Sequence, residues 1–464
     1  MIRAREKRRC SDPFSLQKQA SQSGTGKRIA LKSLGCRTNQ EELQAIAAHC
    51  LRKGYRIVND LSQADIIIVN TCTVTRTAEA KSRRMLEASR RNASQAKILA
   101  TGCLAQQKPE MVRKKMPVDW VVGNAYKDQI CAIISESMGG CVHAPLNTKS
   151  AEPLPMNISL VPVQKALRTR FALKIQEGCD FRCTYCIVPS VRGPARSVSM
   201  GTVLQQAKHV LLAGYKEIVL TGTHIGQYHN AQSTNLVDLL DALVALEGDF
   251  RIRLSSIDPR DLSNDLLDLV VSSPKICNHL HVSVQSLSSR VVERMGRDAG
   301  AVESTIEKLG LIRKNNPILC LGGDFIVGFP GETDEMFEET MAGIHSAGFC
   351  YGHVFRFSSR PGTPAESFTP KVCHQVKNRR SVRLRSILKK TKQDFALSAK
   401  PVVQRILVQN PSPVIGYTSN YLNVRVPNRT LPKNSWATVT INDYNPDTGI
   451  CIGEICSNDP GEIL

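Results

Sequence analysis

Short apolar runs alternate with amphipathic stretches over the first third of the chain, from Arg28 to about residue 135. Apolar runs bounded by polar turns are typical of buried strands, and apolar residues recurring every three or four positions predict a helix. The expected strands are 28–34, 65–70, 97–102 and 119–123, and the expected helices are 39–54 and 76–91. Alternation of this kind predicts a doubly wound parallel sheet in an α/β domain of residues 28–135.

A second alternating series follows residues 136–167, a stretch without periodicity that carries two glycines and four prolines and is interpreted as a linker. Its six apolar segments predict strands at 171–176, 216–222, 251–257, 279–284, 321–329 and 351–357. Helical stretches lie between them. Six such units predict a partial (β/α)6 barrel in a domain of residues 168–392.

The two ends of the chain have a different character. Residues 393–464 contain short alternating segments separated by Asn, Pro and Gly turns, which predict a small antiparallel β-barrel. Residues 377–392, just before them, hold eight basic residues and no acidic one, and we expect a basic helix there. Residues 1–27 are polar and basic without a pattern, so we expect a disordered extension.

The formal net charge of +20 favours a polyanionic partner, with nucleic acid as the leading choice. No run approaches 18 apolar residues, so we expect no membrane partner. The first residues, MIRAREKRRC, lack the hydrophobic core of a secretory signal. Sixteen cysteines in such a chain indicate a reducing compartment, where thiols are free or bind metal. We therefore expect a cytoplasmic protein, and a monomer.

Cys179, Cys183 and Cys186 form a compact set in the run GCDFRCTYC, in the loop after the first strand of the second series. Barrel enzymes place their chemistry at this carboxyl face. A closed zinc site needs four ligands, but the loop has no histidine, and the next one, His209, falls in a predicted helix. Three thiolates also suit an iron–sulfur cluster with one open iron. The residues alone leave both kinds of site open.

The compact set resembles the signature of the radical S-adenosylmethionine (SAM) enzymes, including an aromatic residue, Tyr185, before the last cysteine. In that family three such cysteines hold a 4Fe–4S cluster, and the fourth iron chelates the amino and carboxylate groups of SAM. The resemblance therefore implies reductive cleavage of SAM to methionine and a 5′-deoxyadenosyl radical.

Cys36, Cys72 and Cys103 form a dispersed set, each in a short turn (LGC, NTC and TGC) after a predicted strand. The carboxyl ends of parallel strands meet on one rim of the sheet, where open α/β folds bind ligands. Scattered cysteines are ordinarily small core residues, so the set alone is a weak signal. Its shared rim favours a second site with three thiolates.

Taken together, the two cysteine sets, the barrel and the terminal β-barrel resemble the methylthiotransferase family over nearly the whole chain from residue 28. The family uses the dispersed cysteines for a second 4Fe–4S cluster. Two of its branches modify adenosine beside the tRNA anticodon, one with an isopentenyl and one with a threonylcarbamoyl substituent, and a third modifies an aspartate of a ribosomal protein. The threonylcarbamoyladenosine branch is the one resembled by LTGTHIGQY, GGDFIVGFPGET, FSSRPGTPA and GYTSNYLNVRV.

Three positions depart from that branch. Arg37 stands where a lysine usually follows the first cysteine, Asp258 stands where glutamate is usual, and Leu287 interrupts the more familiar LQSGS. Asp258 keeps the charge of glutamate and shortens its reach by one methylene. These departures concern the SAM geometry and the branch, and they leave the reaction class unchanged.

Further candidates lie in the cluster loop and at the carboxyl ends of the barrel strands, where they can contact SAM: Tyr185, Gly222, Thr223, Asp258 and Gln285. Instead of contacting SAM, Gly222 could serve only as a turn glycine, and the amide of Gln285 could bond only to other protein groups at the barrel rim. The terminal barrel resembles a TRAM domain, an RNA-binding module. This resemblance and the basic helix imply RNA contacts by Arg379, Arg380, Arg383, Arg385, Tyr417 and Tyr421. The alternative for the four arginines is a basic face that contacts only water, and the alternative for the two tyrosines is packing in the barrel core instead of stacking on bases.

The sequence and its resemblance therefore predict a radical SAM transferase with two 4Fe–4S clusters. It would add a methylthio group to carbon 2 of N6-threonylcarbamoyladenosine in tRNA, with an electron donor of the flavodoxin or ferredoxin type. No general base is assigned. Three alternatives stay open: the isopentenyladenosine branch, the ribosomal-protein branch, and a non-catalytic RNA-binding protein structured by iron–sulfur or zinc.

Overall fold

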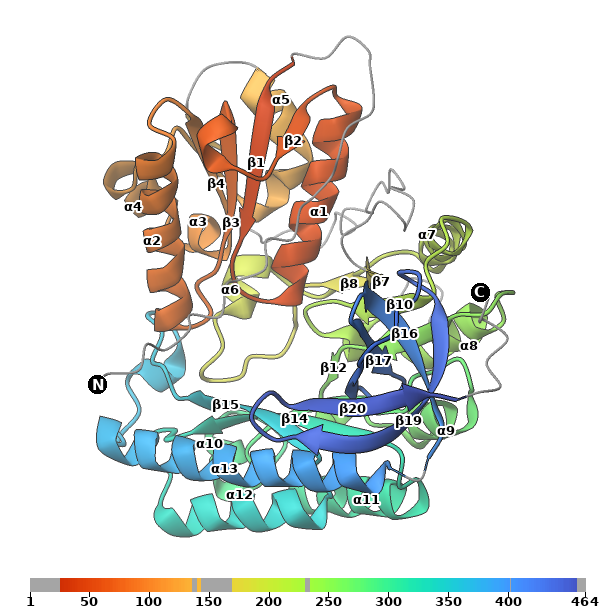
Figure 1. Ribbon diagram of the computed structural model, residues 1–464. Helices are drawn as coiled ribbons and strands as arrows, with labels where there is room; N and C mark the ends of the chain where they lie inside the picture. The colour runs from red at the N-terminus through yellow and green to blue at the C-terminus, as the bar shows by residue number, and fades with distance from the viewer. Residues whose placement is uncertain (1–25, 136–139, 143–168, 230–233, 401, 457–464) are drawn as a thin grey trace, which may run out of the picture.

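The computed structural model describes residues 26–135, 140–142, 169–229, 234–400 and 402–456. Figure 1 shows three parts: an N-terminal α/β domain, a central β/α domain below it, and a C-terminal barrel that lies against the central domain. The disordered extension expected at 1–27 lies outside the described residues except for its last two.

The N-terminal domain is a sheet of six parallel strands in the order β2-β1-β3-β4-β5-β6. The chain winds outward from β1 in both directions, which is the doubly wound arrangement that the sequence predicts. The strands are β1 (Arg28–Ser33), β2 (Arg56–Val58), β3 (Ile66–Thr71), β4 (Lys97–Gly102), β5 (Trp120–Val122) and β6 (Gly140–Val142).

Helices cover both faces of this sheet because its central strands are apolar at successive positions. On β3, Ile66 and Ile68 pack in one core with α1 and α5, whereas Ile67 and Val69 pack in the other with α2 and α4. The helices are α1 (Arg37–Arg52), α2 (Arg76–Asn92), α3 (Cys103–Gln107), α4 (Pro109–Lys115) and α5 (Ile130–Ser135). The Thr75 hydroxyl caps α2 by accepting from the backbone N–H of Ala78 at 3.1 Å.

Strand β6 lies inside the range expected to be a linker. It pairs with β5 from Trp120 opposite Gly140 to Val122 opposite Val142, so the sheet has one edge strand more than the periodicity indicates. Three residues are too few to show a hydrophobic period, and β2 was not predicted for the same reason. Residues 136–139 and 143–167 of the expected linker lie outside the described residues.

The central domain contains the six predicted strands, arranged as two parallel sheets. The third predicted strand breaks at Ser255, and its halves enter different sheets, so that one curved wall results. The first sheet contains β7 (Arg170–Lys174), β10 (Glu217–Thr221) and β11 (Arg251–Leu254). The second contains β12 (Ser256–Ile257), β13 (His279–Gln285), β14 (Cys320–Val327) and β15 (Tyr351–Arg356).

Helices cover the outer side of this wall. On β13, Leu280, Val282 and Val284 belong to the hydrophobic core under the helices, so the alternate residues His279 and His281 face the inner side. The helices of this domain are α6 (Val188–Arg192), α7 (Met200–Leu212), α8 (Leu236–Val244), α9 (Asn264–Ser272), α10 (Ser289–Arg294), α11 (Ala301–Asn315) and α12 (Asp334–Ser346). Of these, α6 lies instead at the contact with the N-terminal domain. A short antiparallel pair, β8 (Gln176–Glu177) and β9 (Arg196–Ser197), precedes α7.

The C-terminal part consists of a long helix and a closed barrel of five strands in the order β16-β17-β18-β20-β19. The barrel was expected to be antiparallel, but β18 and β20 pair in parallel, and β17 was not expected. The elements are α13 (His374–Ser398), β16 (Gln404–Pro411), β17 (Val414–Thr418), β18 (Asn423–Val426), β19 (Trp436–Asn445) and β20 (Ile450–Ile455). Across the described ranges, every helix is too short or too polar to cross a membrane.

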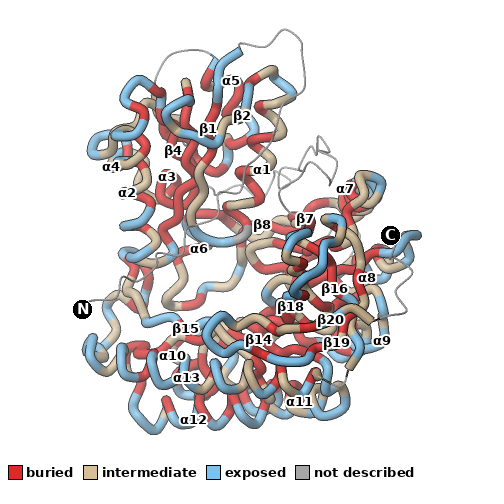
Figure 2. The backbone as a smooth tube through the Cα atoms, viewed as in Figure 1, coloured by how far each residue is buried: buried red, intermediate tan, exposed pale blue. Residues whose placement is uncertain are grey.

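Figure 2 shows how burial divides along these elements. The central strands β3, β4, β10 and β14 are buried over most of their length, whereas the outer turns of α4, α12 and α13 are exposed. The contact between the two domains is buried at α6, which lies between the N-terminal sheet and the central wall. This contact is where the predicted cysteine sets meet.

Candidate active site

The three dispersed cysteines lie together on one rim of the N-terminal sheet. Cys36 precedes α1 and follows β1, Cys72 directly follows β3, and Cys103 directly follows β4. Since β1, β3 and β4 are hydrogen-bonded neighbours in parallel, their carboxyl ends present the three thiols to one another. The predicted shared rim is confirmed.

Two glycines allow these turns to come close. Gly35 has φ +98°, and a Cβ built on it would lie 2.6 Å from the Sγ of Cys72. Gly102 has φ +91°, and a Cβ there would lie 2.4 Å from the carbonyl oxygen of Thr71. Any other residue would be strained and would also clash, so glycine before the first and third cysteines is a packing requirement.

Cys72 and Cys103 of this set are buried, Cys36 is exposed, and the three thiols affect one another. Burial, together with the neighbouring Cys103 and Cys36, raises the pKa of Cys72 to about 12. Burial also raises the pKa of Cys103, which Arg192 opposes. Metal ligation requires thiolates, so iron and the nearby arginine supply the positive charge that three adjacent thiolates need. Three soft donors of this kind fit a four-iron cluster.

The compact set lies at the carboxyl end of the first barrel strand, as predicted. Cys183 is buried, and Cys179 and Cys186 are partly buried. Burial raises the pKa of Cys186 to about 12, and the neighbouring Cys183 and Cys179 also raise it. The backbone of Cys179 donates to the carbonyl of Gly193 at 3.1 Å, and Cys186 donates to that of Cys183 at 3.0 Å. The loop is therefore closed on itself with its thiols gathered.

The turn after β10 holds this loop in place. The backbone N–H of Gly178 donates to the Thr223 hydroxyl at 3.2 Å, and the Gln176 side chain accepts from the N–H of His224 at 2.8 Å. A Cβ at Gly222 would lie 2.9 Å from the carbonyl oxygen of Gln176, so glycine lets the turn approach the loop. Gly222 and Thr223 thus position the cluster loop, and their contact with SAM stays a prediction.

His224 is a neighbour of the compact set that the sequence did not reveal. Its Nδ1 lies 3.6 Å from the Sγ of Cys179, and its Nε2 bonds to Asp261. Burial lowers the pKa of His224, but the hydrogen bonds to Asp261 and Cys179 outweigh it and raise the pKa to about 9. The imidazole is 45 residues from Cys179 in sequence, so only the fold brings it to the sulfur. A protonated ring here donates toward the thiolate.

Tyr185 and Asp258 meet at one arginine. Arg297 lies 2.8 Å from an oxygen of Asp258, and its other nitrogen donates to the Tyr185 hydroxyl at 3.4 Å. Burial raises the pKa of Asp258, but Arg260 and Arg297 hold it below its ordinary value. Arg260 in turn lies over the ring of Phe181 in the cluster loop, 3.3 Å from its centroid. Asp258 therefore holds the arginines that surround the loop.

Gln285 ends β13 with φ +64°, which is uncommon for a residue with a side chain. The register with β14 shifts between Val282 and Gln285, so a bulge turns the strand end. Strained backbone at a strand end on the catalytic face of a barrel is typical of binding positions. A contact between Gln285 and SAM stays a prediction.

The dispersed set lies against the segment that directly follows the compact set, across the domain contact. Cys103 packs with Ile187 and Val191, which lie in the turn and helix directly after Cys186, in one small hydrophobic cluster. The side-chain amide of Asn124 donates to the carbonyl of Val191 at 2.6 Å. The N-terminal domain therefore packs on the segment of the central domain that directly follows the compact set.

Arg192 joins the domains by a buried fork of hydrogen bonds. It is 3% exposed, and its Nη1 donates to Glu42 of the N-terminal domain at 2.7 Å and to Glu177 at 3.0 Å. Its Nη2 donates to the Oδ1 of Asn39 at 2.7 Å. Burial raises the pKa of Glu42, but Arg192 and two buried lysines hold it well below its ordinary value. Glu42 also pairs with Lys127 of its own domain, and Arg192 and Lys174 add two ion pairs across the domain contact.

A second bridge lies at the other end of the wall. Arg360, 2% exposed, donates to the Thr73 hydroxyl at 2.7 Å and pairs with Glu79 at the start of α2. The chain at Arg360 follows β15, and Thr73 follows Cys72. The N-terminal domain is thus held at the first and last strands of the central wall.

Two family models match the chain. Residues 28–123 match the Uncharacterized protein family UPF0004, and residues 173–343 match the Radical SAM superfamily. The first range contains the dispersed cysteines and the second contains the compact set.

Curated relatives match nearly the whole chain. The threonylcarbamoyladenosine tRNA methylthiotransferase MtaB of Aquifex aeolicus is 35% identical over 399 residues, which cover 86% of this chain and 96% of that protein. The chain belongs to the radical SAM methylthiotransferases. The protein of the same name from Bacillus subtilis is 36% identical, covering 85% of this chain and 89% of that protein. The prediction that the chain is a transferase is confirmed.

One solved structure shares the fold. The radical SAM methyltransferase TsrM of Kitasatospora setae, solved with cobalamin and a [4Fe-4S] cluster bound, matches with a TM-score of 0.54 at 14% identity, over 74% of this chain and 77% of that chain. As a family member the methylthiotransferase uses SAM and a 4Fe–4S cluster, and its second cysteine set fits a second cluster.

The residues predicted to bind RNA fall into two groups in this methylthiotransferase. Arg380 is wrong as an RNA contact: it is buried and donates to Glu332 at 2.6 Å and to Asp334 at 2.7 Å, so it fastens α13 to the barrel. The other three arginines, Arg379, Arg383 and Arg385, are exposed on α13. Their contact with RNA stays a prediction.

The two tyrosines lie between the C-terminal barrel and the central domain. The rings of Tyr417 and Tyr421 are 5.4 Å apart, and the guanidinium of Arg170 lies 4.6 Å from the centroid of Tyr417. Tyr421 also lies 4.7 Å from the ring of His279 on β13. These contacts occupy one side of each ring at least, and they show that the tyrosines join two domains. Stacking on bases stays a prediction.

Proposed function

We propose that this enzyme adds a methylthio group to carbon 2 of N6-threonylcarbamoyladenosine next to the anticodon of a tRNA. The reaction class follows from the family, and the substrate is supported by the names of four relatives at 33–36% identity. The observation that carries the proposal is the contact of Cys103 with Ile187 and Val191, which follow Cys186 directly and so bring the dispersed set to the domain contact beside the loop of the compact set.

This juxtaposition suits a reaction that joins hydrogen removal to sulfur insertion at one carbon. When bound, the barrel cluster and SAM supply the carbon radical that removes hydrogen, and the second cluster supplies the sulfur. The protein positions the base between the two. Arg192 and Arg360 fix the distance between the domains, and the Gly222 turn fixes the compact loop.

Other parts of the proposal concern partners and place. We propose tRNA as the nucleic acid that the charge of +20 attracts, and an electron donor of the flavodoxin or ferredoxin type. A monomeric, cytoplasmic enzyme and a TRAM-like role of the C-terminal barrel complete it. The closed five-stranded barrel beside a basic helix supports that role.

A second candidate is the sister tRNA reaction. The tRNA-2-methylthio-N(6)-dimethylallyladenosine synthase of Desulfotalea psychrophila is 32% identical over 77% of this chain and 82% of that protein. The two substrates differ at the N6 substituent, which is polar and carries a carboxylate in one and is apolar in the other. A pocket that hydrogen-bonds a polar group rejects analogues without it strongly.

We therefore expect the reconstituted enzyme to modify tRNA carrying threonylcarbamoyladenosine and to prefer it by about 100-fold or more over isopentenyladenosine tRNA. Both tRNAs are given to the enzyme in one anaerobic reaction with SAM and reductant, and the nucleosides are read by mass spectrometry. Preference for the isopentenyl base would move the enzyme to the sister branch. Turnover of neither tRNA, with SAM cleavage intact, would favour a protein substrate.

The exposed arginines of α13 give a second expectation. Replacing Arg379, Arg383 and Arg385 with glutamate should weaken tRNA binding for all sequences alike, because phosphate contacts carry no sequence information. The dependence of log K on log salt should become shallower by about 1 for each phosphate group that the variant no longer binds. Binding is measured at several salt concentrations, and SAM cleavage should be unchanged.

The matched control reverses three exposed basic residues on α4, at the side of the N-terminal domain and away from α13 (Figure 1): Arg113, Lys114 and Lys115. This variant has the same change in net charge. It should keep a steeper salt dependence than the α13 variant. Equal salt slopes would mean that α13 makes no local contact with RNA.

A further inference from the structure

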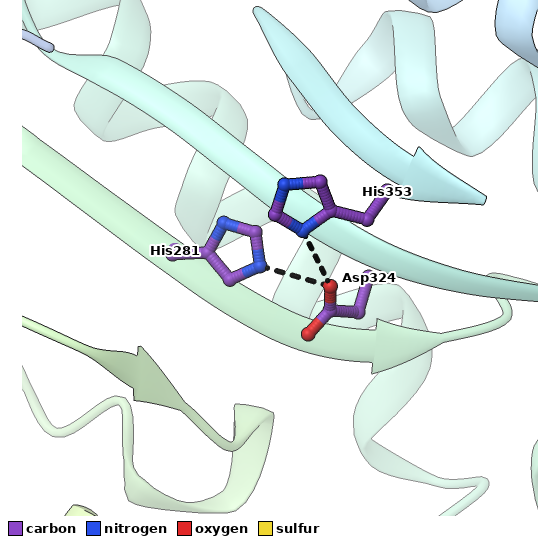
Figure 3. A group of neighbouring side chains, drawn as sticks. All are labelled: His281, Asp324 and His353. Atoms are coloured by element: carbon purple, nitrogen blue, oxygen red, sulfur yellow. Dashed lines mark hydrogen bonds and ion pairs between the residues drawn. The ribbon is translucent and has the colours of Figure 1, made fainter. Parts of the chain in front are cut away.

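A cluster of metal-ligating side chains lies apart from both cysteine sets. Figure 3 shows His281, Asp324 and His353, which come from the neighbouring parallel strands β13, β14 and β15. One ligand atom from each lies within 4.8 Å of the others. The Nε2 of His281 is 3.1 Å and the Nδ1 of His353 is 3.0 Å from the same Asp324 oxygen.

The strands fix this arrangement by their register. Asp324 lies directly opposite His353, and His281 lies opposite Gly322, two residues before Asp324. Residues two apart share a face of a sheet, so all three side chains stand on the same side. The alternate residues Val282, Phe325 and Val354 belong to the hydrophobic core. The cluster is therefore on the inner face of the wall, on elements that hold side chains rigidly.

A second layer of hydrogen bonds orients His281. Its Nδ1 lies 3.0 Å from the Tyr351 hydroxyl, which also lies 2.7 Å from the Nε2 of His279. The ring of Tyr351 lies over Gly322 on its way to the two histidines, and a Cβ on that glycine would lie 2.3 Å from the ring. Ligating histidines almost always bond through their other ring nitrogen, which fixes the ring and its tautomer. His281 has this arrangement, with Nε2 left for the cluster.

We infer that His281, Asp324 and His353 form a binding site for a divalent first-row transition ion of the Zn²⁺ type. Two imidazoles and a carboxylate are a ligand set for such ions, with bonds of about 2.0–2.2 Å, so neighbouring ligand atoms lie roughly 3 Å apart. The two nitrogen–oxygen separations match this spacing. The positive ion would also neutralise Asp324, whose pKa burial raises and the two histidines lower.

The site has access and room for further ligands. The side chain of His353 is 60% exposed and that of Asp324 is 20% exposed, so an ion reaches the cluster without unfolding of the wall. Three protein ligands leave at least one position of a tetrahedral ion for water or for an oxygen of a bound molecule. The inference does not depend on the methylthiotransferase reaction or on which tRNA is modified.

The test uses the full chain with both iron–sulfur clusters reconstituted, so that the cysteines are occupied. After anaerobic dialysis against about 10 µM Zn²⁺ and a desalting step, we expect about one zinc per chain beyond the iron. His353→Ala and Asp324→Asn should lose it. His345→Ala, an exposed histidine at the end of α12, is the matched control and should keep it. Absence of zinc from the wild type, or its retention in His353→Ala, would overturn the site.

Co²⁺ identifies the ligands directly. Cobalt bound by thiolates gives an intense near-ultraviolet charge-transfer band, whereas nitrogen and oxygen ligands give only visible d–d bands. We expect the second spectrum, after subtraction of the iron–sulfur absorbance, and its loss in His353→Ala. Tyr351→Phe keeps all three ligands but removes the bond to His281, and should weaken Zn²⁺ binding about 10–100-fold. A thiolate spectrum would place the ion at the cysteines and overturn the inference.

Discussion

Enzyme in which Cys36, Cys72 and Cys103 are all replaced by alanine should still cleave SAM to 5′-deoxyadenosine and should form no methylthio product. The compact set lies in a separate domain, and Gln176 and Thr223 hold its loop from within that domain. Removing the dispersed thiols should therefore leave the compact set, where SAM is cleaved, intact. Iron content should fall from about eight to about four atoms per chain.

Iron, 5′-deoxyadenosine and methylthiolated nucleoside are measured on the same anaerobic preparations. The matched control is Cys50→Ala with Cys131→Ala, which removes two buried thiols of the same domain, 3.3 Å apart and away from the rim. That variant should keep all the iron and make product. If the rim variant loses SAM cleavage while its barrel cluster stays intact, the division of labour between the two cysteine sets is wrong.

The cysteine sites could be predicted from the sequence because each depends on local pattern. The turns that carry Cys36, Cys72 and Cys103 follow strands whose apolar runs are unmistakable, and parallel strands place their ends on one rim. The compact set needs only its spacing. The compact set thus follows from residues within a few positions of one another, and the dispersed set follows from short local patterns and one rule of topology.

The groups that join the domains could not be predicted, because their partners lie far apart in sequence. Arg192 and Glu42 are 150 residues apart, and His224 and Cys179 are 45 apart. Arg380 shows the opposite failure. It stands in a run of basic residues that is typical of a surface, yet the packing of α13 turns it toward Glu332 inside the barrel. Charge composition shows how many basic residues there are, and only packing shows which of them face water.

Arg192→Met should separate the two half-reactions and destabilise the enzyme. The variant removes the guanidinium that Glu42 and Glu177 share, but Lys127 and Lys174 remain as their buried partners. Because both carboxylates keep a cation, the loss of stability should stay below the about 3–5 kcal/mol that a buried ion pair costs when one member is left alone. Because Arg192 directly follows Val191, which packs on Cys103, the cysteine sets should also shift relative to each other. A displacement of about 1 Å can lower turnover about 100-fold. Methylthiolation should fall by that factor, and SAM cleavage should fall much less.

Three further variants show whether the cause is this bridge. Arg192→Lys keeps the charge but not the fork that reaches Glu42 and Asn39 together, so it should restore stability only in part. Arg192→Met and Glu42→Gln each remove the same direct hydrogen bond, so the double variant should be less destabilised than the sum of the two single variants. Arg113→Met, which removes an exposed arginine of α4, should change neither stability nor turnover measurably. Normal product formation by Arg192→Met would mean that the buried bridge does not set the spacing of the two cysteine sets, and that other contacts, such as Arg360 with Glu79, hold the domains in register.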